Sequence, residues 1–216
     1  MIVVDQRTFV QGRPAGFGTC GEGMPVVLLH GFASSLETWS GLAPKLAREH
    51  RVIALDLKGF GWTDRPEGDY SPAAQAQLVR DLLRQRGVER ASVVAHSWGS
   101  SVALALALAE PQLVQRVVLY DAWVYDEQLP PFFRWAMLPG VGEALFGLYY
   151  NQQPEARLAL GFYRPERVPQ QLVLRRRLWR PAGLEWHPTG SSPGPLRVWR
   201  RALPRVPERH ERPVLF

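Results

Sequence analysis

The sequence predicts an α/β protein with a mostly parallel, doubly wound sheet and a helical cap inserted into it. Over roughly the first 120 of its 216 residues, short apolar runs alternate with helical patterns, and Gly, Pro or polar residues separate them. Strands that alternate with helices form parallel sheets joined by right-handed crossovers. An apolar content of 46% is sufficient for the core of one domain with an insertion.

Four buried strands are predicted from apolar runs that lack the alternation of a half-exposed strand. These runs are 26–29, 52–55, 91–95 and 117–120. The stretch 1–23 contains two weaker strand candidates around a Gly-rich turn, which is typical of an antiparallel hairpin at a sheet edge.

Helical patterns lie between these strands. Ser71 is expected to cap a helix that begins with Pro72, and Gly87 lies where its C-terminal cap belongs. The apolar stripe of this helix consists of Leu78, Val79, Leu82 and Leu83. A second amphipathic helix is indicated by Trp39, Leu42 and Leu46. The small-residue run 99–109 predicts a third helix, able to lie close against the sheet.

The chain divides into three predicted parts. Residues 1–122 form the core with strands one to six, residues 123–185 form a helical cap rich in aromatic residues and Pro, and residues 186–216 form an irregular tail. The short apolar end of the tail resembles the start of a seventh strand. We therefore expect the last strands of the sheet to be missing, through truncation or through a reading-frame shift near Gly183. An exposed edge at strand six would favour self-association.

The charge distribution argues against a nucleic-acid partner. The net charge is +6, but residues 1–150 carry −2 and residues 151–216 carry +8, and only Lys45 and Lys58 among the 26 basic residues are lysine. No recognition motif accompanies this charge. The apolar runs are too short to span a membrane, and no signal peptide is recognisable. The single Cys20 has no neighbours at metal-ligand spacing. The prediction is a cytoplasmic protein that binds no metal.

The strongest motif is the segment 93–100, VVAHSWGS. It predicts a strand, a sharp turn at Ser97 and a helix start, with the small residues Ala95 and Gly99 on either side of the serine. Such a turn strains the serine backbone and presents its hydroxyl at the helix N-terminus, as in a nucleophile elbow. The first position of the G-x-S-x-G pattern is alanine here. The alternative is that Ser97 is an ordinary helix cap.

A second motif lies upstream, where the strand 26–29 runs directly into His30-Gly31-Phe32. Acyl-transfer enzymes need two backbone N–H donors for the tetrahedral intermediate, one from a loop at this place and one from the residue after the nucleophile. Phe32 and Trp98 are the two candidates for this oxyanion hole. The alternative for His30-Gly31 is a simple turn. The later loop 56–66, DLKGFGWTDRP, is interpreted as a Gly-rich turn, and its Asp56 and Asp64 as structural.

Together, these three segments resemble those of the α/β-hydrolase superfamily, particularly serine hydrolases with a helical cap. The resemblance implies an eight-stranded sheet, a Ser-His-acid triad and no cofactor. It implies that Ser97 is the nucleophile, that the amides of Phe32 and Trp98 form the oxyanion hole, and that His30, Gly31, His96 and Gly99 support the motif. Family members that hydrolyse epoxides or carbon-halogen bonds carry aspartate at the elbow, so Ser97 argues against both reactions.

The acid and the base are less clearly indicated. Asp121 ends the predicted sixth strand and is a candidate for the triad acid, although a solvated or capping aspartate is the favoured interpretation. The resemblance implies a base after the eighth strand, and that strand is expected to be missing. His50 lies before a strand, at the far end of the sheet. His187 and His210 lie in the irregular tail.

Two functions follow from these observations. The first is a serine hydrolase that cleaves an ester, lactone, amide or similar carbonyl bond of a small apolar substrate. The second is a catalytically incomplete remnant or small-molecule binding protein that retains the sheet, the pocket and Ser97. A dinucleotide-binding domain is disfavoured, because Gly16-x-Gly18 lacks a following helix and a third glycine.

Overall fold

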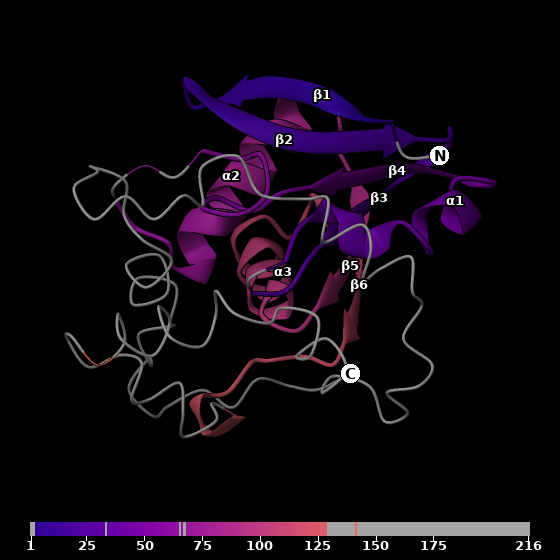
Figure 1. Cartoon of the computed structure of the whole chain (residues 1–216). Coiled ribbons are helices and arrows are strands. Elements are labelled where there is room, and N and C mark those ends of the chain that lie inside the picture. Colours follow the sequence, from indigo (N-terminus) through magenta and orange to yellow (C-terminus); the bar gives the residue numbers. More distant parts are fainter. Residues whose placement is uncertain (1–2, 33, 65, 67, 129–140, 142–216) are drawn as a thin grey trace, which may run out of the picture. The chain divides into compact units, whose positions relative to one another are not determined.

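A computed structural model of the chain describes residues 3–128, apart from 33, 65 and 67, together with residue 141 (Figure 1). All of these except Val141 belong to one of two compact units into which the chain divides, and the fold below is that of this unit. The predicted cap (123–185) lies outside the described residues apart from 123–128 and 141, and the predicted tail (186–216) lies wholly outside them.

The described strands form one mixed sheet, predominantly parallel, in the order β1-β2-β4-β3-β5-β6 (Figure 1). Strands β4, β3, β5 and β6 are parallel, whereas β1 and β2 run antiparallel at one side. Their bounds are β1 Val3–Val10, β2 Arg13–Cys20, β3 Met24–Leu29, β4 His50–Leu55, β5 Ala91–His96 and β6 Val114–Tyr120. The predicted fold class is confirmed, and each predicted parallel strand lies within an observed one.

The predicted N-terminal hairpin is also confirmed. A two-residue turn, Gln11 and Gly12, joins β1 to β2, with φ of 54° and 74°. Two positive φ values match the twist of the flanking strands, which makes this turn type common in tight hairpins. The Gly16-x-Gly18 pair lies within β2, which leads into β3 and not into a helix.

Helices cover both faces of the sheet, as the alternation of side chains along β3 shows. Val27 and Leu29 enter the larger core with residues of α2 (Pro72–Gln85) and α3 (Gly99–Ala109). Val26 and Leu28 point the other way, into a smaller core that contains Leu36, Trp39 and Ala43. Because successive side chains of a strand alternate between its faces, a strand buried on both sides is apolar throughout.

The helix α2 has the predicted boundaries. The Ser71 hydroxyl accepts the Ala74 N–H at 3.2 Å, and Pro72 occupies the first helical turn. The helix ends at Gln85, and Gly87 follows with φ of 65°, a conformation that glycine adopts without steric cost. None of the helices described by the structure is long and apolar enough to span a membrane.

The second predicted helix differs from the prediction. Its apolar residues fall on two short elements, the 3₁₀ helix η1 (Leu36–Trp39) and the single turn α1 (Ala43–Leu46), and Leu42 between them is exposed. Pro44 accounts for the break, because proline has no N–H to continue a helix and is tolerated only in the first turn. A last 3₁₀ turn, η2 (Asp126–Gln128), follows β6.

Candidate active site

The loops that follow β3, β4, β5 and β6 all leave the same edge of the sheet, because these strands are parallel. Ligands of open α/β sheets bind at this carboxyl edge. All the candidate residues of the oxyanion loop and the nucleophile elbow lie here, whereas His50 starts β4 and therefore lies at the opposite end.

Ser97 lies in a sharp turn between the last residue of β5 and the first residue of α3. Its φ is 51°, in the left-handed region that non-glycine residues rarely adopt. Two backbone hydrogen bonds hold the strained turn: Ser97 N–H donates to Tyr120 O at 3.0 Å, and Trp123 N–H donates to Ser97 O at 3.2 Å. The half-buried Ser97 hydroxyl has no hydrogen bond to any residue that the structure describes.

Two glycines allow the loop after β3 to lie against this turn. A Cβ on Gly99 would be 2.5 Å from His30 O, and a Cβ on Gly31 would be 3.1 Å from Ser97 Cβ. Contacts of the first kind do not occur in real structures, so the approach of α3 to the end of β3 depends on glycine at position 99. The structure thus brings together the two predicted motifs, which lie more than 60 residues apart in the sequence.

His30 is a fully buried part of the loop framework. Its Nδ1 donates to Gly31 O at 2.7 Å, and its Nε2 accepts the Leu57 N–H at 3.0 Å. These two bonds require the neutral ring with its proton on Nδ1. Burial lowers the pKa of His30 from 6.5 to about 4, which favours the same neutral form. Both ring nitrogens are engaged, so His30 holds loops together and is not placed to take a proton from Ser97.

Asp56 is the fully buried carboxylate beside this histidine. Its Oδ1 accepts the Leu36 N–H at 2.8 Å and lies 4.0 Å from His30 Nε2. Its Oδ2 accepts the Trp62 N–H at 2.9 Å. The sequence predicted a structural aspartate but not these partners, and the only local signal was a strand end followed by Asp56, Gly59 and Gly61.

An aromatic cluster lines the site on the side of these loops. Phe60 packs edge-on against Phe32, Trp98 and His30, with ring centroids 5.5, 5.8 and 5.6 Å apart, respectively. Trp98 is almost completely buried, whereas Phe32 is half-buried. Sequence reasoning assigned roles only to the backbone amides of Phe32 and Trp98, and Phe60 was not singled out. The cluster packs the two loops that carry the predicted oxyanion donors against one another.

His96 and Asp121 lie next to one another, at the ends of the neighbouring strands β5 and β6. His96 Nε2 is 4.0 Å from Asp121 Oδ2, and the Asp121 side chain is 85% exposed. Burial lowers the pKa of His96, and the Asp121 carboxylate partly offsets that effect. Asp121 has φ of 50° and lies in the turn that carries Tyr120 O and Trp123 N to the Ser97 backbone.

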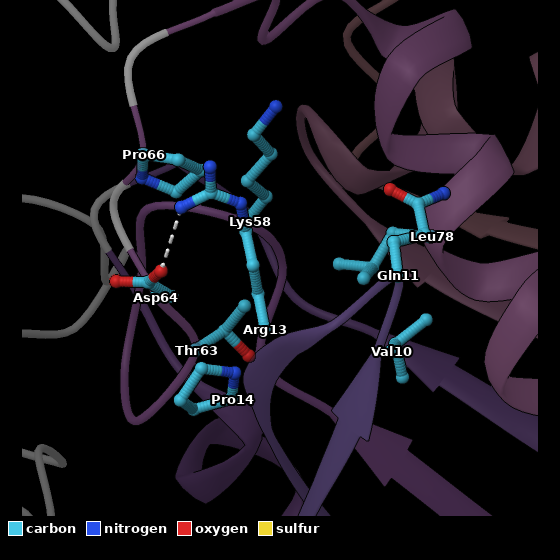
Figure 2. Close-up of a pocket in the computed structure, with 9 residues that line it drawn as sticks. All are labelled: Val10, Gln11, Arg13, Pro14, Lys58, Thr63, Asp64, Pro66 and Leu78. Atoms are coloured by element: carbon cyan, nitrogen blue, oxygen red, sulfur yellow. Dashed lines mark hydrogen bonds and ion pairs between the residues drawn. The ribbon is translucent and has the colours of Figure 1, made fainter.

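A pocket of about 90 Å³ with a mixed polar and apolar lining lies elsewhere, between the β1–β2 turn and the loop 58–66 (Figure 2). Two of its lining residues form an ion pair, with Arg13 Nη1 3.3 Å from Asp64 Oδ2. Neither Ser97, Phe32 nor Trp98 lines it. Among the described residues no cluster of three or more metal-ligating side chains occurs.

Comparison with known proteins settles the family. A family model described as alpha/beta hydrolase fold matches residues 24–191. The chain belongs to the alpha/beta hydrolase fold family. A solved epoxide hydrolase, CorEH, has a similar structure, with a TM-score of 0.75 at 26% identity over 92% of this chain and 73% of that one.

Curated relatives of this alpha/beta hydrolase align with only part of the chain. An uncharacterized protein of Mycobacterium tuberculosis is 41% identical over 63% of this chain and 40% of its own length. A soluble epoxide hydrolase of Corynebacterium sp. is 34% identical over 55% of this chain and 42% of its own length. A 2-hydroxymuconate semialdehyde hydrolase of Pseudomonas sp. is 35% identical over 46% of this chain and 36% of its own length. The alignments with these relatives thus span about 40% of their length.

Proposed function

We propose that this chain carries the nucleophile of a serine hydrolase, which cleaves an ester, lactone, amide or similar carbonyl bond of a small apolar substrate. The observation that carries the proposal is the strained backbone of Ser97, with φ of 51°, at the junction of β5 and α3. Strain of this kind costs about 1–3 kcal/mol and persists where the surrounding structure enforces it, often at active sites.

In the proposed reaction, Ser97 Oγ attacks the carbonyl carbon and its proton passes to a base. The amides of Phe32 and Trp98 stabilise the oxyanion that develops. Collapse of this intermediate expels the leaving group, which takes up a proton, and water then hydrolyses the acyl-enzyme. The half-buried Phe32 ring, which packs against Phe60 and Trp98, supports an apolar acyl group. The reaction needs no cofactor.

The residue at the elbow distinguishes among the activities named for the relatives. An epoxide hydrolase and a fluoroacetate dehalogenase are among them, and those activities would need an aspartate nucleophile, where this chain has Ser97. A 2-hydroxymuconate semialdehyde hydrolase is also among them, and its named substrate is a carbonyl compound. The serine therefore supports a carbonyl substrate in this chain.

Labelling with a fluorophosphonate ester tests the proposal, because this reagent phosphonylates an activated serine hydroxyl. We expect the protein to gain one phosphonyl group, located at Ser97 by peptide mass spectrometry, and Ser97→Ala to gain none. Ser92→Ala, in the strand β5 that precedes the Ser97 turn, is the matched control and should label like the unaltered protein. Absence of labelling in the unaltered protein would contradict the proposal.

That outcome would favour the alternative, a binding protein that retains Ser97 without turnover. One observation supports this alternative. None of the histidines that the structure describes is hydrogen-bonded to Ser97 Oγ, and His30 is engaged at both ring nitrogens. His187 and His210 lie outside the described residues. Slow or absent labelling together with retained binding of an apolar ester would identify the binding protein.

A further inference from the structure

The carboxylate of Asp56 is connected, through the Leu36 N–H, to the loop that carries Phe32. We propose that Asp56 is a positioning residue for the oxyanion loop, which it holds in the geometry that the Phe32 amide needs. The inference rests on the proposed function, since it assigns a role in the same reaction. It differs from that function in predicting which residue outside the site controls the rate.

Two adjacent residues that directly follow β4, Asp56 and Leu57, hold the loop after β3 at its two ends. At the first end, the Leu57 N–H donates to His30 Nε2 at 3.0 Å. At the second end, Asp56 Oδ1 accepts the Leu36 N–H at 2.8 Å. Phe32 lies between these two anchors. All four anchoring residues are buried, so water does not compete for the bonds.

Asp56 is itself held rigidly, which a positioning residue requires. Its second oxygen, Oδ2, accepts the Trp62 N–H at 2.9 Å. Its backbone N–H donates to Gly16 O at 2.9 Å, and its backbone carbonyl accepts the Thr63 hydroxyl at 2.6 Å. The Thr63 hydroxyl oxygen in turn accepts the Gly16 N–H at 2.9 Å. The carboxylate is thus fixed relative to β2 and to its own loop.

Two glycines leave the space that the carboxylate occupies. A Cβ on Gly61 would lie 2.1 Å from Asp56 Cγ, and a Cβ on Gly16 would lie 2.8 Å from Asp56 Oδ2. The chain therefore packs tightly around a charged group that has no contact with Ser97 in the described structure. A buried charge is costly unless each of its acceptors has a donor, and here the donors come from the loops around the site.

Movement of the loop after β3 would displace the neighbouring residues of the nucleophile elbow. Gly31 is in that loop, and its Cα lies close enough to the elbow that a Cβ would be 3.1 Å from Ser97 Cβ. His30 O lies against Gly99 at the start of α3. Loss of the Leu36 anchor would free one end of the loop and misplace the Phe32 amide. Misplacement of one oxyanion donor lowers the chemical rate by roughly 10²–10³-fold while leaving substrate binding unchanged.

Kinetics of fluorophosphonate labelling separate these two quantities, as the maximal rate of inactivation (kinact) and the reagent concentration for half of that rate (KI). The variant is Asp56→Asn, which keeps the shape of the side chain but cannot accept both the Leu36 and Trp62 N–H groups. We expect kinact to fall roughly 10²-fold, with KI within about twofold of the unaltered protein. Unchanged kinact, or a change confined to KI, would overturn the proposal.

Two further variants complete the comparison. His30→Gln disturbs the other anchor of the loop and should show the same loss of kinact at constant KI. Asp64→Asn is the matched control, since Asp64 is in the same loop as Asp56, is partly exposed and pairs with Arg13. Its kinact should not change, and an equal loss there would overturn the proposal. If the unaltered protein is not labelled at all, the proposed function fails. If it is labelled and Asp56→Asn is labelled with the same kinact, only the role of Asp56 fails.

An NMR measurement on the unaltered protein keeps the proposal testable even if the variants do not fold. Phosphonylation of Ser97 should move the Phe32 amide proton downfield, because it donates to the phosphonyl oxygen, and the Leu36 amide should exchange slowly with solvent before and after. An unmoved Phe32 amide, or rapid exchange at Leu36, would overturn the proposal.

Discussion

The loops after β4 and β6 each begin with an aspartate, Asp56 after β4 and Asp121 after β6. The two carboxylates have opposite surroundings. Asp56 is fully buried and accepts N–H groups from Leu36 and Trp62. The Asp121 side chain is 85% exposed, and only its backbone, with φ of 50°, shapes the turn. The first loop stabilises the site through a side chain, the second through its main chain.

The difference follows from the position of each strand in the sheet. β4 lies between β2 and β3, so that loops from both neighbours surround its end. β6 is the last strand of the described sheet, with Val118 and Tyr120 exposed by 55% and 69%. A charge can be retained without water only where several loops supply donors. The same residue type thus has different functions in the centre and at the edge.

The largest expected difference is in stability. Asp56→Ala should lower the free energy of unfolding by about 3–5 kcal/mol, because the buried Leu36 N–H and the partly buried Trp62 N–H lose their acceptor and a cavity remains. Asp121→Ala should lower it by only about 1 kcal/mol, because the side chain is 85% exposed and the cost comes from alanine at a φ of 50°. Urea unfolding followed by circular dichroism measures both. Equal losses of unfolding free energy at the two positions would contradict the difference between the buried and the exposed aspartate.

The buried loop should also be the more sensitive to acid. The unfolded His30 side chain takes up a proton near its ordinary pKa of 6.5, whereas the folded one does so only near 4. Protonation therefore favours the unfolded chain within this window. The free energy of unfolding should fall by on the order of 3 kcal/mol from this group as pH drops from about 6.5 to 4, with no further loss below.

Unfolding midpoints across this pH range, for the unaltered protein and His30→Gln, test the expectation. The variant should lose less stability between pH 6.5 and 4 than the unaltered protein does. An identical pH dependence in the two proteins would show that His30 is not held neutral by the fold.

A pair of glycine substitutions isolates the space around Asp56. Gly61→Ala combines a positive φ of 50° with a Cβ 2.1 Å from the Asp56 carboxyl carbon, whereas Gly12→Ala has φ of 74° and nothing within 4 Å. The second should cost about 1 kcal/mol for the backbone conformation alone, and the first about 1–3 kcal/mol more for overpacking. Equal losses of stability in the two variants, measured by thermal unfolding, would mean that the Asp56 carboxylate can move aside without an energetic cost.

At the other region, we propose that β6, the last strand of the described sheet, supports self-association through its exposed side chains. An edge strand with apolar side chains offers unpaired backbone groups to another chain. Val118→Lys should weaken association about tenfold, which corresponds to about 1.4 kcal/mol. Phe9→Lys on the opposite edge strand β1, where Phe9 is 67% exposed, is the matched control. Sedimentation velocity across a concentration series measures the strength of association. A monomer at all concentrations would contradict the proposed self-association.

The smallest effect is expected for Asp121→Asn. If Asp121 only shapes the turn, kinact for fluorophosphonate labelling should stay within about twofold of the unaltered protein. Loss of the acid from a Ser-His-Asp triad lowers the rate by about 10⁴-fold in a serine protease. A loss approaching that size would identify Asp121 as the triad acid.

Much of the fold followed from local patterns in the sequence. The cap of α2 at Ser71, its end before Gly87, and the helix 99–109 were all predictable, because they depend on neighbours within one helical turn. The division of 36–46 into η1 and α1 was not predicted, although Pro44 was the signal for it. The roles assigned to Ser97, Phe32, Trp98 and Asp121 stay predictions.

The sequence alone determined the order of strand, turn and helix around Ser97, since the apolar run before it and the small-residue helical run after it are local patterns. Only the tertiary structure decided what surrounds Asp56, whose partners Leu36, Trp62 and Gly16 come from three separate segments of the chain. Periodicity and backbone sterics are local, whereas the choice of hydrogen-bond partners depends on which strands become neighbours. With β4 placed between β2 and β3, an ordinary strand-end aspartate becomes a buried anchor.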